Sequence, residues 1–95
     1  MTTPLIDREE TETGGRYVTV IGGARAEMTY SKAGQTRIII DHTDVPDELR
    51  GQSVGLALVR RAVEDARAGG FKIIPLCPFA KATLQKHPEW ADVVQ

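Results

Sequence analysis

The sequence is poor in the residues that build metal centres and covalent cross-links. Its 95 residues contain one cysteine, Cys77, and two histidines, His42 and His87. A single thiol cannot form a disulfide within the chain, and a zinc site needs about four ligands at short spacings that these residues do not have. The sequence therefore predicts neither a disulfide scaffold nor a thiolate metal site.

The sequence also lacks an excess of charge of one sign and a long apolar run. Its Lys and Arg residues number 12 and its Asp and Glu residues 13, so the formal net charge is −1. No global positive field attracts nucleic acid, and no stretch approaches the roughly 20 apolar residues of a membrane span. Residues 1–10 have no apolar run typical of a secretory signal. We expect one cytoplasmic domain over residues 1–95, without nucleic-acid or membrane partners.

The first half of the chain has the pattern of an antiparallel sheet. Residues 16–21 are rich in β-branched and aromatic side chains, and Gly22-Gly23 follows as a two-residue hairpin turn. Residues 24–30 are expected to form the returning strand and residues 36–45 the next one. The polar residues 1–14 are open to two interpretations, an edge strand or a flexible tail.

The second half has the pattern of a βαβ unit followed by a helix. Residues 54–68 place apolar side chains at helical spacing before Gly69-Gly70. A short apolar strand is expected at residues 71–76, and Pro78 opens a second helix to about residue 86. Because a helical crossover joins them, the two flanking strands should be parallel. The predicted fold class is α/β: a mixed sheet with an antiparallel N-terminal half, one βαβ unit and a C-terminal helix.

The segment between these two parallel strands carries the strongest signal of function. It reads Val45-Pro46-Asp47-Glu48-Leu49-Arg50-Gly51-Gln52-Ser53-Val54-Gly55 and joins a strand to a helix N-terminus. Unpaired N–H groups and the helix dipole at such a junction favour an anion. Gly51 and Gly55 permit a close backbone approach, and the Arg50 guanidinium suits phosphate oxygens. The segment predicts a phosphate site; the simpler interpretation is a bare strand-to-helix connection.

This segment resembles the pyrophosphate-binding motif of the GCN5-related N-acetyltransferase superfamily. That motif is Gln or Arg, two residues, Gly, one residue, then Gly or Ala; Arg50 and Gly55 match it, and Ser53 replaces the middle glycine. Four blocks over residues 24–94 are together similar to a small YjdJ-type group of N-acetyltransferases. They are His42-Thr43-Asp44-Val45-Pro46, Arg50-Gly51-Gln52, Pro75-Leu76-Cys77-Pro78-Phe79 and Lys86-His87-Pro88-Glu89-Trp90.

The resemblance implies a shortened acetyltransferase fold that binds acetyl-coenzyme A (acetyl-CoA) or coenzyme A (CoA). The cofactor's pantetheine arm would run between the two parallel strands where they splay apart. A backbone N–H at Asp44–Val45 would polarise the thioester carbonyl. Pro75 fits such a splay, because proline cannot donate to a sheet ladder. The cofactor-binding residues implied are Asp44, Val45, Arg50, Gly51, Gln52, Ser53, Val54 and Gly55.

Cys77 and His42 are the candidate catalytic residues. Cys77 follows the second parallel strand, where it would be an acid for the departing thiolate, a nucleophile or a packing residue. His42 shares strand parity with Ile38 and Ile40. It would be a general base, an activating partner of Cys77, or a histidine that only holds the loop in place.

The function predicted is transfer of an acetyl group from acetyl-CoA to an amine, either a small molecule or a protein lysine. The alternative is a CoA-binding module without significant turnover, regulated through the thiol of Cys77. The sequence does not identify the acceptor, because specificity depends on loops that a chain of this length hardly has. Lys81, Lys86 and His87 have ordinary explanations as solvated or helix-ending residues.

Overall fold

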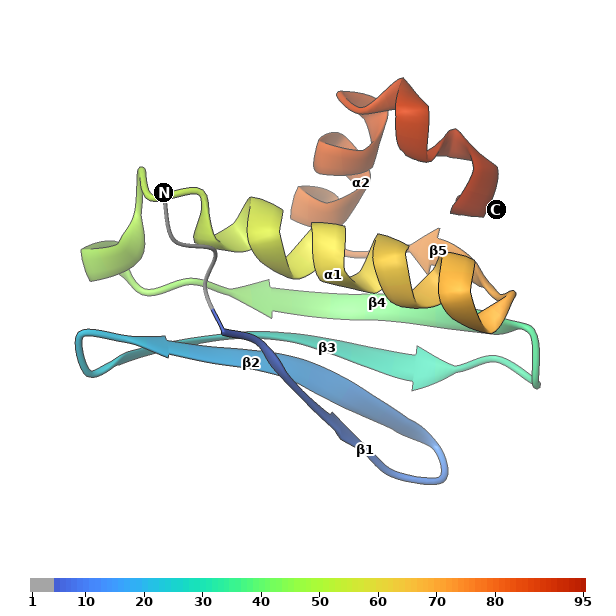
Figure 1. Cartoon of the computed structure of the whole chain (residues 1–95), viewed down its shortest axis with the longest axis horizontal. Helices are drawn as coiled ribbons and strands as arrows, with labels where there is room; N and C mark the ends of the chain where they lie inside the picture. The colour runs from blue at the N-terminus through green and yellow to red at the C-terminus, as the bar shows by residue number, and fades with distance from the viewer. Residues whose placement is uncertain (1–4) are drawn as a thin grey trace.

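A computed structural model describes residues 5–95 as one five-stranded mixed sheet with its helices on one side (Figure 1). Strands that follow one another in the chain are neighbours in the sheet, in the order β1-β2-β3-β4-β5. This arrangement confirms the predicted fold class. In chain order the elements are β1 (Asp7–Glu10), β2 (Gly14–Ile21), β3 (Ala24–Lys32), β4 (Arg37–Asp44), the 3-10 turn η1 (Asp47–Leu49), α1 (Val54–Gly69), β5 (Lys72–Pro75), α2 (Pro78–Gln85) and the 3-10 segment η2 (Pro88–Val93).

Strands β2 and β3 form the hairpin that the sequence predicts. Gly22 and Gly23 both have positive φ, 58° and 84°, as a two-residue hairpin turn of this type requires. The pairing places Tyr17 opposite Met28, and both side chains are fully buried on the face that carries the helices. The alternate side chains of β2 and β3 face the other side of the sheet.

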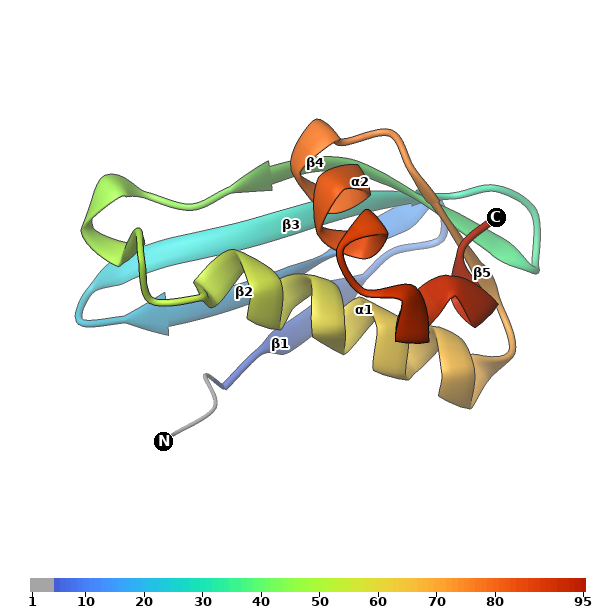
Figure 2. The same ribbon diagram turned by 90° about the horizontal axis from the view of Figure 1, so that it is seen from above.

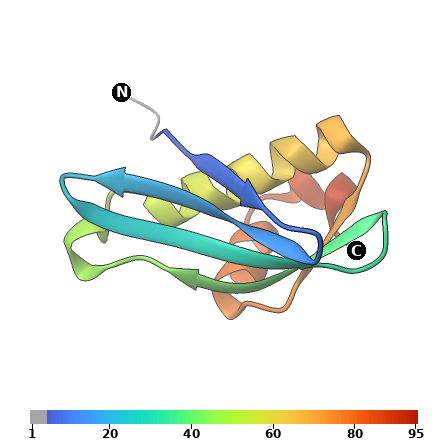
Figure 3. The same ribbon diagram turned by 90° about the horizontal axis from the view of Figure 1, so that it is seen from below.

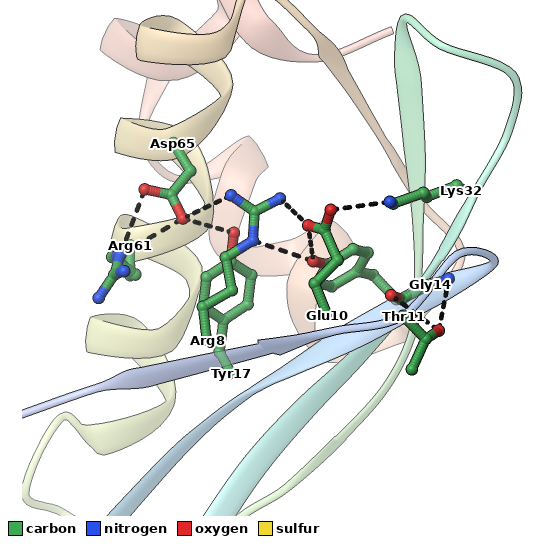
Figure 4. Close-up of polar contacts among 9 residues, drawn as sticks. Arg8, Glu10, Thr11, Gly14, Tyr17, Lys32, Arg61 and Asp65 are labelled. Atoms are coloured by element: carbon green, nitrogen blue, oxygen red, sulfur yellow. Dashed lines mark hydrogen bonds and ion pairs between the residues drawn. The ribbon is translucent and has the colours of Figure 1, made fainter.

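Part of the segment 1–14 forms an edge strand, β1; residues 1–4 lie outside the described part. β1 pairs antiparallel with β2 and is tied to the rest of the molecule by Arg8 (Figure 4). The Arg8 guanidinium contacts Glu10 at 2.6 Å and reaches Asp65 of α1 at 3.4 Å. Tyr17 of β2 donates a 2.8 Å hydrogen bond to the same Asp65 carboxylate. These contacts hold β1 and β2 against α1.

β4, α1 and β5 form the predicted βαβ unit, and β4 and β5 pair in parallel. The buried side of α1 consists of small and branched residues, and Gly70 ends the helix with φ of 72°. Figures 2 and 3 show that α1 and α2 cover the same face of the sheet, while the other face is bare. The core therefore lies between one sheet face and the helical layer of α1, α2 and η2. Its α1 members are Val54, Leu58, Val59, Ala62, Val63 and Ala66.

A bulge in β4 changes the direction of its side chains before the strand ends. Tyr30 of β3 pairs with Ile40, whereas the preceding Thr29 pairs with His42, so Asp41 is one extra residue on β4. Asp41 is held in place by a 2.7 Å hydrogen bond that the Ser31 hydroxyl donates to its carboxylate. Beyond Asp41 the alternation of faces is reversed relative to the first half of the strand.

The C-terminal segment packs over α1 and β5. Pro78 stands in the first turn of α2, and Trp90 and Val93 of η2 are buried. The N–H of Gln95 donates to the carbonyl of Ile73 at 2.9 Å, which ties the chain end to β5. Over residues 5–95, no helix has the length and apolar character needed to cross a membrane.

Candidate functional site

The two parallel strands separate halfway along β4. Their pairing ends at Ile40 and Pro75, and within the described residues β5 does not continue beyond Pro75. One further hydrogen bond, from the Cys77 N–H to the Ile40 carbonyl at 3.0 Å, closes the junction. β4 continues for four more residues to Asp44. The strands therefore open a gap beside the second half of β4, and Pro75 stands at its start, where a ladder donor is no longer needed.

The loop after β4 adopts two left-handed backbone conformations in quick succession. Gly51 has φ of 79°, and Ser53, the N-cap of α1, has φ of 60° and ψ of 26°. Ser53 is the one non-glycine residue with positive φ over residues 5–95. A serine held in this region costs about 1–2 kcal/mol, and such strained residues concentrate at binding sites.

The start of α1 offers donors to a ligand. No side chain caps the N–H groups of its first turn, and that turn contains no acidic residue. The positive end of the helix dipole and these free N–H groups together favour a bound anion. Arg50 adds a cation beside them: its side chain is 77% exposed, and its only ion pair in the described part of the chain is with the equally exposed Asp47 at 3.1 Å. An exposed pair of this kind is readily exchanged for a phosphate.

A groove of about 580 Å³ lies between this loop, the end of β4 and one side of α2. Its size is in the range of sites that hold small molecules and cofactors. α1 and α2 stand on the same side of β4, so the groove opens on the helix-bearing side of the sheet (Figure 2). Its lining residues are Thr43, Val45, Leu49, Arg50, Gly51, Ser53, Val54, Gly55, Leu56, Phe79, Thr83, Lys86 and His87.

Gly55 is needed in the groove for packing as well as for access to the backbone. A Cβ atom at this position would lie 2.5 Å from the Cζ atom of Phe79. The aromatic ring of α2 therefore lies directly on the first turn of α1. It is 44% exposed and gives the groove an apolar side next to the free N–H groups.

Cys77 lies behind the groove and is held by a groove residue. Its thiol donates a hydrogen bond of 3.4 Å to the hydroxyl of Thr43, and the residue is only 5% exposed. Burial by itself raises the pKa of the Cys77 thiol, but the Thr43 hydroxyl and the backbone N–H groups of Ala80 and Phe79 stabilise the thiolate. The net pKa lies below the ordinary value. Position 77 is also the N-cap of α2, where the dipole favours a negative charge.

His42 does not contact Cys77, so its interpretation as an activating partner of the thiol is wrong. The register pairs Met28 with Thr43 and Thr29 with His42. Met28 is buried under the helices, so Thr43 points to the helix side and His42 to the bare side of the sheet. The bulge at Asp41 is the physical reason, because one extra residue reverses the parity that His42 was expected to share with Ile38 and Ile40.

Two of the expected cofactor-binding residues also lie outside the groove. Asp44 pairs with Glu27 in the register and shares the bare face with His42. The Gln52 side chain folds back on the loop and donates to the Glu48 carbonyl at 3.1 Å. The six other expected residues line the groove: Val45, Arg50, Gly51, Ser53, Val54 and Gly55.

Sequence reasoning missed the side of the groove that α2 supplies. Phe79, Thr83, Lys86 and His87 all line it. Phe79 and Thr83 are four residues apart on one face of α2, and that spacing was the available signal; Lys86 is the C-cap of the helix and His87 follows it. The spacing could not show that the face lies opposite the phosphate loop, because that depends on how α2 packs on α1.

The comparisons with known proteins agree with this geometry. Residues 16–93 match a family model described as GCN5-related N-acetyl-transferase. A search of curated proteins found no match. A solution NMR structure described as a "GCN5-like putative N-acetyltransferase" from Staphylococcus aureus is 38% identical, with a TM-score of 0.75, over 100% of this chain and 91% of that chain.

The family match covers most of the chain, and the solved structure has the same fold at substantial identity. The strand gap and the loop at the start of α1 are the features that the resemblance implied. The narrower YjdJ-type group stays a prediction. This chain belongs to the GCN5-related N-acetyltransferase family, whose members generally use acetyl-CoA.

Proposed function

We propose that this protein binds acetyl-CoA in the groove and transfers its acetyl group to an amine. The observation that carries the proposal is the position of the loop. Arg50 and the first residues of α1, whose N–H groups no side chain caps, line the same groove as Thr43 and Val45, which follow the point where β4 and β5 separate. A diphosphate at the loop would place the attached arm in the gap between the strands.

The groove residues divide the binding between phosphate and apolar contacts. Arg50, Gly51 and Ser53 surround the anion, and the first N–H groups of α1 donate to it. Val45 and Phe79 provide apolar contact for the rest of the molecule. The backbone of Asp44–Val45, at the end of β4, is proposed to orient the thioester carbonyl. The Asp44 side chain on the bare face is then free for another role.

Acetyl-CoA supplies an acetyl group on a good thiol leaving group. The chain has to hold that carbonyl, accept a proton from the amine and return one to the leaving sulfur. Cys77, under Thr43, is proposed to serve at the leaving sulfur as a proton donor or as a nucleophile; its lowered thiol pKa supports the second role. His42 and Asp44 are proposed as bases for an amine that arrives on the bare face.

Binding is tested by isothermal titration with CoA and acetyl-CoA at fixed salt. Saturable binding of both is expected for the wild-type protein. Arg50→Glu should abolish it without unfolding the chain, because the Arg50 side chain is exposed and pairs only with Asp47 among the described residues. Lys81→Glu is the control, since Lys81 is an exposed α2 residue that does not line the groove. Unchanged affinity in Arg50→Glu would overturn the loop assignment.

A second candidate function is a CoA-binding module without significant turnover. It is supported by the bare sheet face, because β1 leads directly into β2 and no helix covers the side on which an acceptor would sit (Figure 3). In this case Cys77 would regulate binding through a mixed disulfide with CoA. Mass spectrometry of acetyl-CoA consumption with added amines separates the two: amine-dependent loss of acetyl-CoA supports the transferase. A mass shift that dithiothreitol reverses supports the thiol-regulated module.

A further inference from the structure

One face of α2 follows the groove over its whole length. Phe79 lies at the start of the helix against Gly55, Thr83 follows one turn later, and Lys86 and His87 stand at the helix end. Phe79 and Thr83 share one face of α2, and Lys86 and His87 follow at its C-terminal end, so the groove extends along α2 beyond the phosphate loop. A ligand bound at the phosphate loop can therefore also contact the C-terminal end of α2.

The two residues at that end differ in how firmly they are held. The Lys86 side chain forms no ion pair in the described part of the chain, and the residue is exposed. His87 is held in place: its Nδ1 contacts Glu89 Oε2 at 3.0 Å, and its ring stacks on Trp90 at 4.2 Å between centroids. With Nδ1 engaged by a carboxylate, Nε2 is the ring nitrogen left for a ligand.

A basic pair at the end of a helix has a simpler explanation, because cations there stabilise the helix dipole. That explanation does not account for both side chains lining the groove. The groove has a cationic end at Arg50 and another at Lys86, with His87 beside it. The partly buried Leu56 and the exposed Phe79 line it as well. Cationic side chains at both ends of a groove with apolar walls suit a ligand that carries phosphate at two separate positions of one nucleoside.

CoA has that chemistry, since its adenosine carries a diphosphate on the 5′ side and a single phosphate at the 3′ position. We propose that Lys86 and His87 bind the 3′-phosphate and make this protein select CoA over 3′-dephospho-CoA. The inference rests on the proposed function for the diphosphate at the loop and adds a specificity determinant to it. Lys86 donates from a flexible ammonium group. His87 donates from a fixed ring, through Nε2 of the protonated imidazole, because Nδ1 is engaged by Glu89.

The test measures the dissociation constants of CoA and 3′-dephospho-CoA by isothermal titration, at one pH and one ionic strength. The wild-type protein should bind CoA about threefold to tenfold more tightly, the range for a partly exposed charged contact. Lys86→Gln should bring the ratio of the two constants close to one and leave the affinity for 3′-dephospho-CoA unchanged. The double variant Lys86→Gln with His87→Asn should abolish the preference. Lys81→Gln, which removes the same charge from the same helix outside the groove, should keep the wild-type ratio.

The outcomes separate the two levels of the proposal. Equal affinities of the wild-type protein for both ligands, or an unchanged ratio in the double variant, would overturn the 3′-phosphate site and leave the loop assignment standing. Loss of thermal stability in the double variant with an unchanged ratio would show that the pair serves only the helix dipole. If neither ligand binds the wild-type protein, the CoA site itself fails and this inference fails with it.

Discussion

The Cys77 thiol and the Thr43 hydroxyl lie 3.4 Å apart, although 34 residues separate them in the chain. Thr43 belongs to the second half of β4 and Cys77 to the N-cap of α2, so the contact joins the two sides of the strand gap. It connects the thiol to the groove, because Thr43 is itself a lining residue. The only cysteine in the sequence is thereby held next to the groove that we propose for acetyl-CoA.

Thr43→Val should raise the pKa of the Cys77 thiol. Burial already raises it, and the Thr43 hydroxyl is the strongest of the contacts that lower it, so its removal leaves the thiolate with backbone donors alone. The measurement is an NMR titration of protein labelled with ¹³C at the cysteine Cβ, which reports on Cys77 alone. Thr29→Val, on the bare face of the sheet, is the control. A titration midpoint unchanged by Thr43→Val would contradict the role of this hydroxyl.

Ser53→Gly should stabilise the protein by about 1 kcal/mol, because glycine adopts positive φ without the cost that a Cβ atom brings. Chemical denaturation measures the free energy of unfolding. Ser53→Ala keeps the Cβ atom and should give no gain. CoA affinity should survive Ser53→Gly, since the superfamily motif has glycine at this position. A loss of affinity in both Ser53→Gly and Ser53→Ala would show that the serine hydroxyl itself binds the ligand.

Gly55→Ala tests the contact between α1 and α2. In a helix this change alone favours stability by about 0.5–1 kcal/mol, but here the new Cβ atom meets the Phe79 ring at 2.5 Å. We expect a neutral or destabilising effect in the wild-type protein. In a Phe79→Ala background the same change should be stabilising, because the ring is gone. A double-mutant cycle on unfolding free energies measures the difference. Equal effects in both backgrounds would show that the ring moves aside at no cost.

Glu10→Gln should make the free energy of unfolding less dependent on pH below neutrality. Hydrogen bonds from Lys32 and Tyr30 hold the pKa of the Glu10 carboxyl below its ordinary value. A carboxyl with a lowered folded pKa stabilises the protein above its unfolded pKa, and that stability is lost as pH falls through the folded pKa. The Glu10 side chain is 37% exposed, so the contribution is less than about 1 kcal/mol.

The measurement for Glu10 is the free energy of unfolding from pH 7 down to pH 3. The wild-type protein should exceed Glu10→Gln at pH 7, and the two values should converge in acid. Glu12→Gln is a control, because Glu12 is exposed and forms no ion pair in the described part of the chain. Parallel curves for wild type and Glu10→Gln would contradict the assignment.

Local patterns were sufficient to predict most of the fold. The Gly22-Gly23 turn, the apolar stripe of α1 and Pro78 at the start of α2 each depend on neighbouring residues only. The loop at residues 45–55 was predictable for the same reason, since free N–H groups at a helix start follow from chain order. Whether residues 1–14 include a strand was not predictable, because β1 depends on pairing with β2 and on the contact of Arg8 with Asp65.

The candidate site was predicted only where it depends on the loop. His42 was placed wrongly because a bulge is a property of two paired strands, and the β4 sequence alone does not reveal the extra residue Asp41. The Lys86 and His87 pair was interpreted as a helix end, because the groove exists only after α2 packs on α1.

By itself, therefore, the sequence determined most of the secondary structure and the α/β class, since each follows from residues a few positions apart. Tertiary structure decided which side of the sheet His42, Thr43 and Asp44 face at the end of β4. It also decided that Thr43, not His42, is the partner of Cys77. The physical reason is that strand register and helix packing are set by contacts between residues far apart in the chain, and one inserted residue reverses every side chain after it.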